Sequence, residues 1–400
     1  MNSNPAGNNE MKFSGLTDRV KGSAADVWDL HYLAKQAAAR GEDVIVLSVG
    51  DPDFATPEPV IGRALRAMHE GDTHYTSILG HAELRAAIAE CHRRSSGQAV
   101  DADRIITTSG AQNALFACSL CLLDAGDEAI VLQPMYVTYE ATVQAPGAKL
   151  VPVVLDPDQG FRLNAQALQD AITDRTRAIF YASPSNPTGV ALNPDELEII
   201  ADAARRHDLW VVADEVYADF VYDEEFHHIA SLPGMDERAI TIGSLSKSYA
   251  MSGWRVGWAI APRQMIANME KLALCMLYGL PGFIQQAGAE ALKHCQADLE
   301  NMRERYRQRR DYLYTAFSGI PGLEPLLPDA GMFMMVDVRG SGRSASEFVH
   351  ELYDATGVSV LDATAFGASA EGYVRVSYTV TEAELEEACA RIRGFMESLS

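Results

Sequence analysis

The stretch LWVVADEVY, from Leu209 to Tyr217, joins a run of apolar and β-branched residues to an acidic residue, Asp214. A short apolar run without polar alternation predicts a strand that is buried on both faces. A carboxylate at the end of such a strand needs a partner, because an unpaired buried charge is unfavourable. Tyr217 lies near enough to share the same site if the chain turns. The stretch therefore predicts a central strand with functional residues at its carboxyl end.

The same pattern recurs between about residues 100 and 260. Apolar runs at Ile105–Thr108, Ala178–Ala182 and Ala239–Gly243 lead into SGAQNALFACSL, SPSNPTG and SLSK. This alternation is typical of βα units, and it predicts an α/β fold with a mostly parallel central sheet flanked by helices. Asn193 before Pro194 predicts the start of one of these helices.

The pattern changes from about residue 288. GAEALKHCQADLENMRERYRQRRDYLYTAF predicts one long helix, followed by the strand GMFMMVDV, a helix, the strand YVRVSYTV and a terminal helix from Glu382. An N-terminal helix over about Ala25–Gly41 and the strand DVIVLSVG precede the βα series, so we expect them to join this smaller α+β domain. The expected division is a disordered tail at 1–20, a small domain from 21–54 and 290–400, and a large domain at 55–289.

The composition limits the class of protein. A net charge of −22 over 400 residues argues against nucleic acid or an anionic membrane surface as the main partner. The sequence carries neither an apolar run long enough to span a bilayer nor an N-terminal signal pattern. Six cysteines suit a reducing compartment, so we expect a cytoplasmic protein. Cys118 and Cys121 lie in an apolar helical run without a second pair at zinc spacing, and we expect no metal site.

Small polar residues follow two of the expected strands. Ser109, Gly110 and Ala111 form a turn before an apolar helix, where free backbone N–H groups suit a phosphate. An ordinary helix cap has the same composition. Asn186 lies in the turn SNPTG, where its amide could donate to a ligand or serve only the turn.

Cationic residues follow the strand that leads into SLSKSYAMSGWRVGW. A lysine near a buried site loses its proton readily and acts as a nucleophile, which makes Lys247 a candidate. Arg255 suits bidentate binding of a phosphate, alongside Ser244. Either cation alone would be read as a surface charge. Together with Asp214 they match pyridoxal 5′-phosphate, which needs a lysine for its aldehyde, an anion for its ring nitrogen and anchors for its phosphate.

At this point the chain resembles the class I and II aminotransferases of fold type I. The resemblance covers roughly residues 20–395 and is carried, in family order, by VGDPDFATP, THYTS, SGAQNA, SNPTG, DEVY, SLSKSYAMSGWRVGW and EGYVRVSY. It implies a large domain that binds pyridoxal phosphate and a homodimer with shared active sites. It also implies ping-pong transfer of an amino group from an amino acid to a 2-oxo acid, through aldimine and pyridoxamine forms.

The resemblance implies roles for individual residues around the cofactor ring. Lys247 would form the Schiff base and, once released, would move a proton during the reaction. Asp214 would keep the ring nitrogen protonated. Asn186 and Tyr217 would bond the ring oxygen, and Tyr136 would stack on the ring.

Other residues would hold the phosphate or the substrate. The implied phosphate ligands are Ser109, Gly110, Ala111, Ser244 and Arg255, with Tyr75 reaching over from the neighbouring subunit. Arg375 would clamp the substrate carboxylate with help from Gly50 and Asn186. Asp362 and Ala363 stand where many relatives carry Pro-Gly, so the local turn is expected to differ there.

Within the family, VWDLHYLA, LSVGDPDF, THYTS, PMYVTYEA, HDLW and LALCMLYG are most similar to arginine–pyruvate transaminases. This implies transfer from L-arginine to pyruvate, with Asp29 or Trp28 near the substrate guanidinium. LALCMLYG offers no cation for a second carboxylate.

Three alternatives stay open at this point. The donor could be aspartate, alanine or an aromatic amino acid. The same site could also serve a pyridoxal-phosphate β-lyase. A non-catalytic regulator of the same fold is a further possibility, but such regulators carry an added DNA-binding domain, which we do not expect here.

Overall fold

The run from Trp210 to Asp214 forms β6, the fourth strand of a seven-stranded sheet. In the computed structural model, which describes residues 12–22 and 25–399, the strand order is β2-β8-β7-β6-β5-β3-β4. Strand β8 runs antiparallel to β2 and β7, and the other neighbouring pairs are parallel. The predicted mostly parallel sheet is confirmed. The strands are β2 (Ile105–Ser109), β3 (Glu128–Gln133), β4 (Lys149–Val154), β5 (Thr176–Ala182), β6 (Trp210–Asp214), β7 (Ala239–Ser244) and β8 (Val256–Ile260).

Helices cover both faces of this sheet. Successive side chains of a strand point to opposite faces, so a single strand packs against both layers of helices. On β6, Val212 packs in the apolar cluster that includes residues of α5 and α10, whereas Val211 and Ala213 pack in the cluster that includes residues of α8. Helix α8 begins at Pro194 with Asn193 as its side-chain cap, as predicted. The helices of this part are α3 (Glu58–His69), α4 (Ala82–Ser96), α5 (Ala111–Leu122), α6 (Thr138–Gln144), α7 (Ala165–Ala171), α8 (Pro194–His207), α9 (Leu245–Ser248), α10 (Arg263–Met276) and α11 (Gly282–His294).

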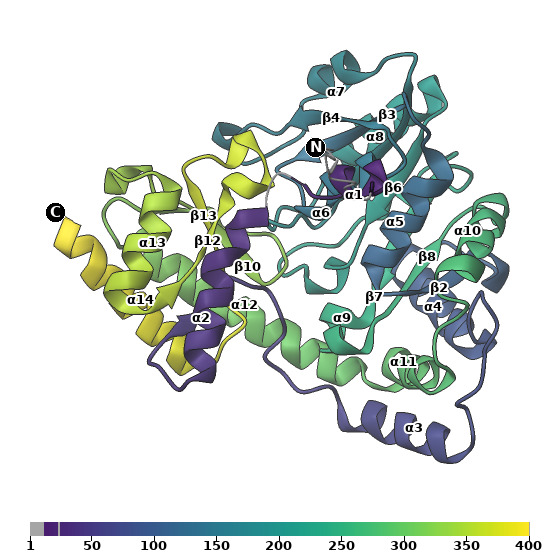
Figure 1. Ribbon diagram of the computed structural model, residues 1–400, viewed down its shortest axis with the longest axis horizontal. Coiled ribbons are helices and arrows are strands. Elements are labelled where there is room, and N and C mark those ends of the chain that lie inside the picture. Colours follow the sequence, from purple (N-terminus) through teal and green to yellow (C-terminus); the bar gives the residue numbers. More distant parts are fainter. Residues whose placement is uncertain (1–11, 23–24, 400) are drawn as a thin grey trace, which may run out of the picture.

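A smaller group of elements lies beside the large sheet (Figure 1). Its antiparallel sheet has the order β12-β13-β10-β9, and β1 pairs with β11 in a separate two-stranded sheet. The N-terminal strand therefore lies among C-terminal elements, while the residue bounds of the two domains stay a prediction. The elements are α2 (Asp29–Ala39), β1 (Ile45–Val46), α12 (Gln296–Ser318), β9 (Glu324–Pro325), β10 (Phe333–Asp337), α13 (Ala345–Thr356), β11 (Val358–Ser359), β12 (Leu361–Asp362), β13 (Tyr373–Ser377) and α14 (Glu382–Leu399).

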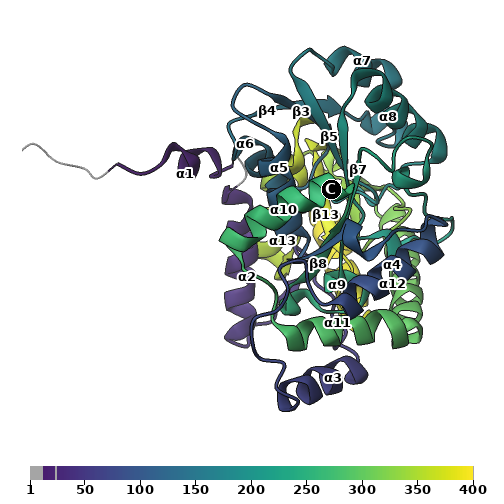
Figure 2. The same cartoon turned by 90° about the vertical axis from the view of Figure 1, so that its right-hand side faces the viewer.

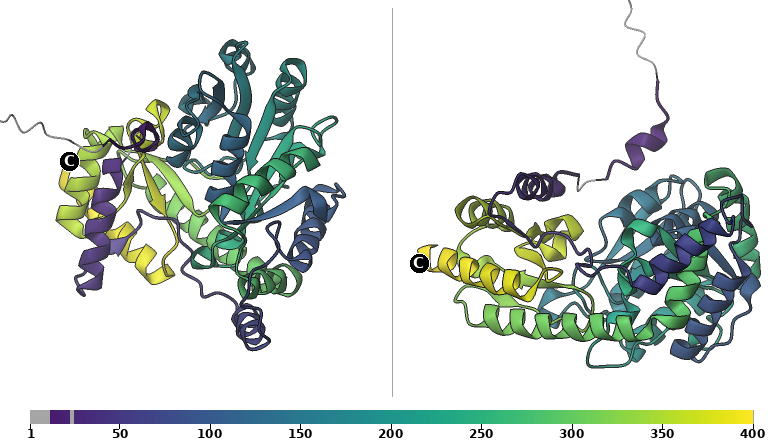
Figure 3. Two further views of the ribbon diagram at one scale, coloured as in Figure 1. Left: turned by 45° about the vertical axis from the view of Figure 1, so that its right-hand side comes forward. Right: turned by 90° about the horizontal axis from the view of Figure 1, so that it is seen from below.

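The single long helix predicted from about residue 288 is wrong, because Cys295 interrupts it. Its backbone, at φ −108° and ψ 27°, ends α11 and starts α12. The Cys295 side chain is fully buried in the core, so the break lets α11 pack on α3 and α4 while α12 runs to the smaller sheet. Figure 3 shows α12 connecting the two parts of the molecule.

The N-terminal region differs from the disordered tail expected for residues 1–20. Residues 1–11 lie outside the described residues, but Gly15–Arg19 forms the short helix α1, capped by Ser14. The Arg19 guanidinium donates to the carbonyl oxygens of Gln144 and Ala145. Figure 2 shows α1 projecting from the molecule near α6. None of the described helices is long and apolar enough to cross a membrane.

Candidate active site

The parallel strands β2, β5, β6 and β7 end at one edge of the large sheet, so the residues that follow them meet there. A cavity of about 230 Å³ lies at this edge, where α/β folds commonly bind their ligands. The structure brings most of the predicted residues together in its wall. They are Trp28, Gly50, Ala111, Tyr136, Asn186, Asp214, Tyr217, Ser244, Lys247, Arg255 and Arg375.

Lys247 reaches the cavity from α9, directly after β7. The Ser244 hydroxyl caps this short helix by accepting from the Ser246 N–H at 3.0 Å. Lys247 Nζ donates a 2.6 Å hydrogen bond to the carbonyl oxygen of Gly50. Burial penalises the ammonium and lowers the pKa of Lys247 to about 8. The neutral, nucleophilic form of this amine is therefore more populated near neutral pH than that of an ordinary lysine.

Asp214 is buried at the end of β6. Its Oδ2 accepts a 2.9 Å hydrogen bond from the Tyr139 hydroxyl, and its Oδ1 accepts from the Val216 N–H at 3.3 Å. Burial raises the pKa of Asp214 to about 6, while these two donors oppose that shift. The sequence analysis did not predict this hydrogen bond from Tyr139 to Asp214. The only sign of it in the sequence is that Tyr139 lies three residues after Tyr136.

The turn after β2 forms a narrow cradle at the N-terminus of α5. Gly110 has φ 77°, and a Cβ atom at that position would meet the Arg255 guanidinium. Gly257 on β8 packs so closely that its Cβ would lie 2.6 Å from the Ala111 nitrogen. Arg255 Nη2 donates to the carbonyl of Ser109 at 3.3 Å. A helix N-terminus beside a cation suits a phosphate.

Arg375 projects from β13 and is 2% exposed. Its Nη1 donates to Asn186 Oδ1 at 2.8 Å, and its Nη2 donates to the carbonyl of Ser48 at 2.9 Å. Its Nε has no hydrogen-bond partner within the described residues. The Ser48 carbonyl was not predicted, because a backbone contact leaves no mark in the sequence. Burial lowers the pKa of Arg375 to about 10, so the side chain stays charged at neutral pH.

Two aromatic residues complete the wall. Tyr217 is 5% exposed and its hydroxyl interacts with the side chain of Asn186. Burial raises its pKa well above the usual value, so the phenol stays protonated. The rings of Tyr136 and Tyr139 meet edge to face at 6.2 Å.

Asp29 and Tyr75 lie outside this cavity, whereas Gly50 lines it. Asp29, predicted near the substrate, is exposed and lines a separate cavity of about 720 Å³, because α2 begins there and turns it away from Trp28. Gly50 lines the cavity as predicted, and its carbonyl accepts the hydrogen bond from Lys247. Tyr75 lies outside the small cavity, 89% exposed, with its ring 4.8 Å from that of Tyr278.

Neither the cysteines nor the acidic residues form an alternative site in the described part of the chain. All six cysteines are free thiols, and burial raises the pKa of both Cys118 and Cys121. No group of three or more His, Cys, Asp or Glu side chains within residues 12–22 and 25–399 is placed to hold a metal ion.

Comparison with known proteins identifies the family. The sequence profile of aminotransferase class I and II matches residues 42–392. The chain belongs to the class I and II aminotransferases. An arginine–pyruvate transaminase of Pseudomonas aeruginosa is 49% identical over 96% of this chain and 97% of its own length. An aspartate aminotransferase of Pyrococcus horikoshii is 34% identical over 90% of this chain and 93% of its own length.

Solved structures give the same family. The aspartate aminotransferase of Thermus thermophilus with maleate has a TM-score of 0.91 at 33% identity, and the match covers 96% of this chain and 100% of that one. The aspartate aminotransferase of Rhizobium meliloti has the same score at 33% identity over 98% and 100% of the two chains. This aminotransferase therefore has the fold-type I architecture that its motifs implied.

Proposed function

We propose that this aminotransferase uses pyridoxal 5′-phosphate to move the α-amino group of L-arginine to pyruvate. One observation carries the proposal. One cavity is lined by a lysine of lowered pKa, a buried carboxylate, a phosphate-type cradle and a buried arginine. The Nε atom of that arginine has no hydrogen-bond partner in the part of the chain that the structure describes. The arginine–pyruvate transaminase named above, at 49% identity, supports the choice of donor and acceptor.

The residues of the cavity fit this cofactor. Lys247 would hold its aldehyde, and Asp214 would bond its ring nitrogen with the carboxylate that Tyr139 orients. Gly110 and Arg255 would hold its phosphate, together with Ser109, Ala111 and Ser244. When bound, the cofactor supplies an aldehyde that takes up the amino group and a ring that accepts electron density from the substrate Cα.

The side chains of this chain then have distinct tasks. Arg375 binds the substrate carboxylate, since it lines the cavity and its Nε has no hydrogen-bond partner among the described residues. Lys247, with a pKa near 8, moves the proton at the substrate Cα as a general base and acid. Asn186 and Tyr217 orient the cofactor's ring oxygen, and Tyr136 stacks on the ring.

The charge of the cavity favours a donor with a single carboxylate. Its cations among the described residues are Lys247, Arg255 and Arg375, and each already has a task. None of them is therefore left in this chain for a second carboxylate. Trp28 offers an aromatic face for a guanidinium. Asp29, which lines the neighbouring cavity, is the weaker candidate for that contact.

We further propose that the working unit is a homodimer. Tyr75 is a large aromatic residue that is 89% exposed and in contact with Tyr278, which is itself half exposed. The two rings are tilted by 56° and their centroids lie 4.8 Å apart, so they are in contact but not stacked face to face. Such an exposed aromatic pair suits an interface core, where aromatic residues are enriched. In the dimer, Tyr75 of the partner subunit would reach the cofactor phosphate.

A donor panel on the cofactor-loaded enzyme tests the proposal. Arginine, alanine, aspartate and aromatic amino acids are each offered with pyruvate or 2-oxoglutarate. We expect arginine with pyruvate to give the highest kcat/KM, and arginine alone to convert the cofactor to its amine form without releasing ammonia. Ammonia release without an oxo acid would identify a lyase. A preference for aspartate would overturn the assigned donor.

A further inference from the structure

One short segment touches both cations that the proposed function uses for catalysis and substrate binding. The segment, residues 47–54, follows β1 and has no regular secondary structure. The carbonyl of Ser48 accepts from Arg375 Nη2 at 2.9 Å, and the carbonyl of Gly50 accepts from Lys247 Nζ at 2.6 Å. The position of this backbone therefore sets the position of both cations.

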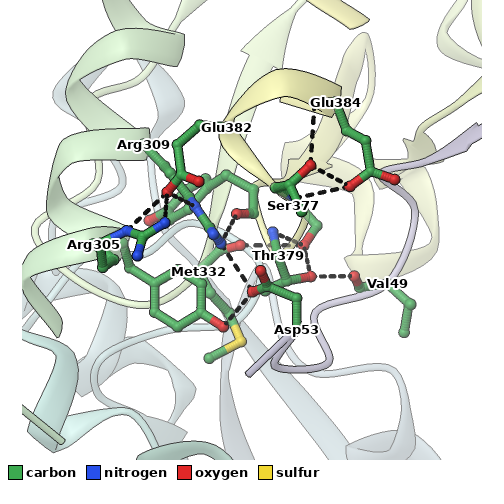
Figure 4. Close-up of polar contacts among 12 residues, drawn as sticks. Val49, Asp53, Arg305, Arg309, Met332, Ser377, Thr379, Glu382 and Glu384 are labelled. Carbon is green, nitrogen blue, oxygen red and sulfur yellow. Dashed lines mark hydrogen bonds and ion pairs between the residues drawn. The ribbon is translucent and has the colours of Figure 1, made fainter. Parts of the chain in front are cut away.

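A buried arginine outside the cavity anchors the far end of the segment (Figure 4). Arg309, on α12, is 3% exposed and its Nη1 donates to Asp53 Oδ1 at 2.8 Å. The Tyr306 hydroxyl donates to the same oxygen at 3.1 Å. The Arg309 guanidinium also lies 5.4 Å from the ring centroid of Phe54. Arg309 thus contacts both Asp53 and Phe54 and links this end of the segment to α12.

A second carboxylate fixes that cation in turn. Glu382, the first residue of α14, accepts from Arg309 Nε at 3.0 Å and from Arg305 Nη2 at 2.6 Å (Figure 4). Arg305 makes no contact with Asp53 among the described hydrogen bonds and ion pairs, and 41% of its side chain is exposed. The two arginines therefore share Glu382, and both lie over the Phe54 ring, at 5.9 Å for Arg305 and 5.4 Å for Arg309. Of the two, Arg309 is the one that pairs with Asp53.

The other side of the segment rests on the chain that follows β13. Thr379 Oγ1 donates to the carbonyl of Val49 at 3.2 Å and lies 2.8 Å from Ser377 Oγ (Figure 4). The Ser377 N–H donates to the carbonyl of Leu47 at 2.8 Å. Because β13 also carries Arg375, a displaced segment would lose its alignment with that guanidinium.

We propose that Arg309 and Asp53 are positioning residues for amino-group transfer. They hold the 47–54 segment so that the carbonyls of Ser48 and Gly50 orient Arg375 and Lys247. Without Asp53, the buried Arg309 keeps only Glu382 as a carboxylate partner among the described residues, so its charge is less well compensated and the local structure shifts. Small shifts of binding groups cost large factors in rate. This inference rests on the proposed function, because it concerns the same two cations.

Matched variants test this role. Asp53→Asn and Arg309→Met remove the anchor, Arg309→Lys retains its charge, and Arg305→Met is the control that disturbs Glu382 without touching Asp53. Hydrogen–deuterium exchange of peptides covering residues 45–54, measured on the apoprotein, reports the segment independently of activity. We expect Asp53→Asn and Arg309→Met to accelerate exchange there about tenfold, with partial rescue by Arg309→Lys and no change in Arg305→Met.

Kinetics and spectra of the cofactor-loaded variants complete the test. Asp53→Asn and Arg309→Met should raise KM for both the amino acid and the oxo acid about tenfold or more, and should shift the pH midpoint of the lysine-bound cofactor's absorbance. Arg305→Met should match the parent. The inference would be overturned if Asp53→Asn folds and keeps both the parental exchange rate of residues 45–54 and the parental KM. It would also be overturned if Arg305→Met changed exchange and KM as much as Arg309→Met does. A parent enzyme that transfers no amino group would instead overturn the proposed function.

Discussion

Arg375 Nη1 donates a 2.8 Å hydrogen bond to Asn186 Oδ1, which joins the smaller sheet to the chain that follows β5 of the larger one. The bond and the Ser48 carbonyl hold the guanidinium in one orientation, between the rings of Phe333 and Phe366 at 5.2 and 5.0 Å. One charged donor, Nε, keeps no partner within the described residues. Under the proposed function, the substrate carboxylate would satisfy that donor.

Arg375→Ala therefore weakens the binding of both substrates. Loss of a buried, charged hydrogen-bond partner amounts to about 2–5 kcal/mol, which is roughly 30- to 5,000-fold in KM. Lys247 and the cradle at Gly110 would hold the cofactor without a bond to this arginine, so the variant should still retain its cofactor. Steady-state kinetics with the amino acid and the oxo acid measure the effect. An unchanged KM for both substrates would show that Arg375 does not bind the carboxylate.

Tyr139→Phe removes one of the two hydrogen bonds on Asp214. We expect weaker cofactor binding and a lower kcat, by about 1.5–3 kcal/mol in total, the range for a hydrogen bond to a charged group. A double-mutant cycle with Asp214→Asn identifies the route. If Tyr139 acts through Asp214, its loss adds little in the Asp214→Asn background. Fully additive effects would contradict that route.

The lowered pKa of Lys247 predicts how cofactor uptake depends on pH. Attack on the aldehyde needs the neutral amine, whose fraction grows as pH rises through about 8. Uptake by the apoprotein should therefore accelerate between about pH 7 and 9 and then level off. Because the unfolded chain binds more protons at this lysine between pH 8 and 10.5, Lys247 also makes the free energy of unfolding rise with pH there. Stopped-flow absorbance measures uptake, and a midpoint near 10 would contradict the buried amine.

Gly110→Ala tests whether the close contact between Gly110 and Arg255 matters for cofactor binding, apart from the strain of a left-handed backbone. Gly97 is the matched control, since it has φ 72° against 77° for Gly110 but open space where its Cβ would lie. Both alanine variants should lose about 1–2 kcal/mol of stability through the left-handed backbone. Gly110→Ala alone should weaken cofactor binding, because its methyl group displaces Arg255. Equal cofactor affinity in the two variants would remove Gly110 from the phosphate site.

The sequence was most informative where burial and polarity conflict. Asp214 at the end of an apolar run predicted both β6 and a functional carboxylate, and the structure has that strand and a buried carboxylate. Lys247 and Arg255 could be read as a pair because they follow one strand end, and they line one cavity. Chemistry that depends on side-chain type and on strand ends was therefore predictable.

Tertiary contacts were not predictable in this way. Tyr139 reaches Asp214 only after α6 and β6 pack together, and Ser48 contributes a carbonyl, which every residue has. The break at Cys295 has no Pro or Gly to mark it, since buried packing decides it. Asp29 and Trp28 are adjacent in sequence but diverge where η1 (Ala25–Trp28) passes into α2.

The most direct test is to locate the cofactor on the chain. Borohydride reduction of the loaded enzyme, followed by peptide mass spectrometry, fixes the cofactor to the lysine that holds it. The account predicts attachment at Lys247 in the parent and in Lys271→Ala, a control lysine whose Nζ bonds Asn268 outside the cavity. It predicts no attachment and no amino-group transfer in Lys247→Ala. Attachment to another lysine, or transfer that survives in Lys247→Ala, would contradict it.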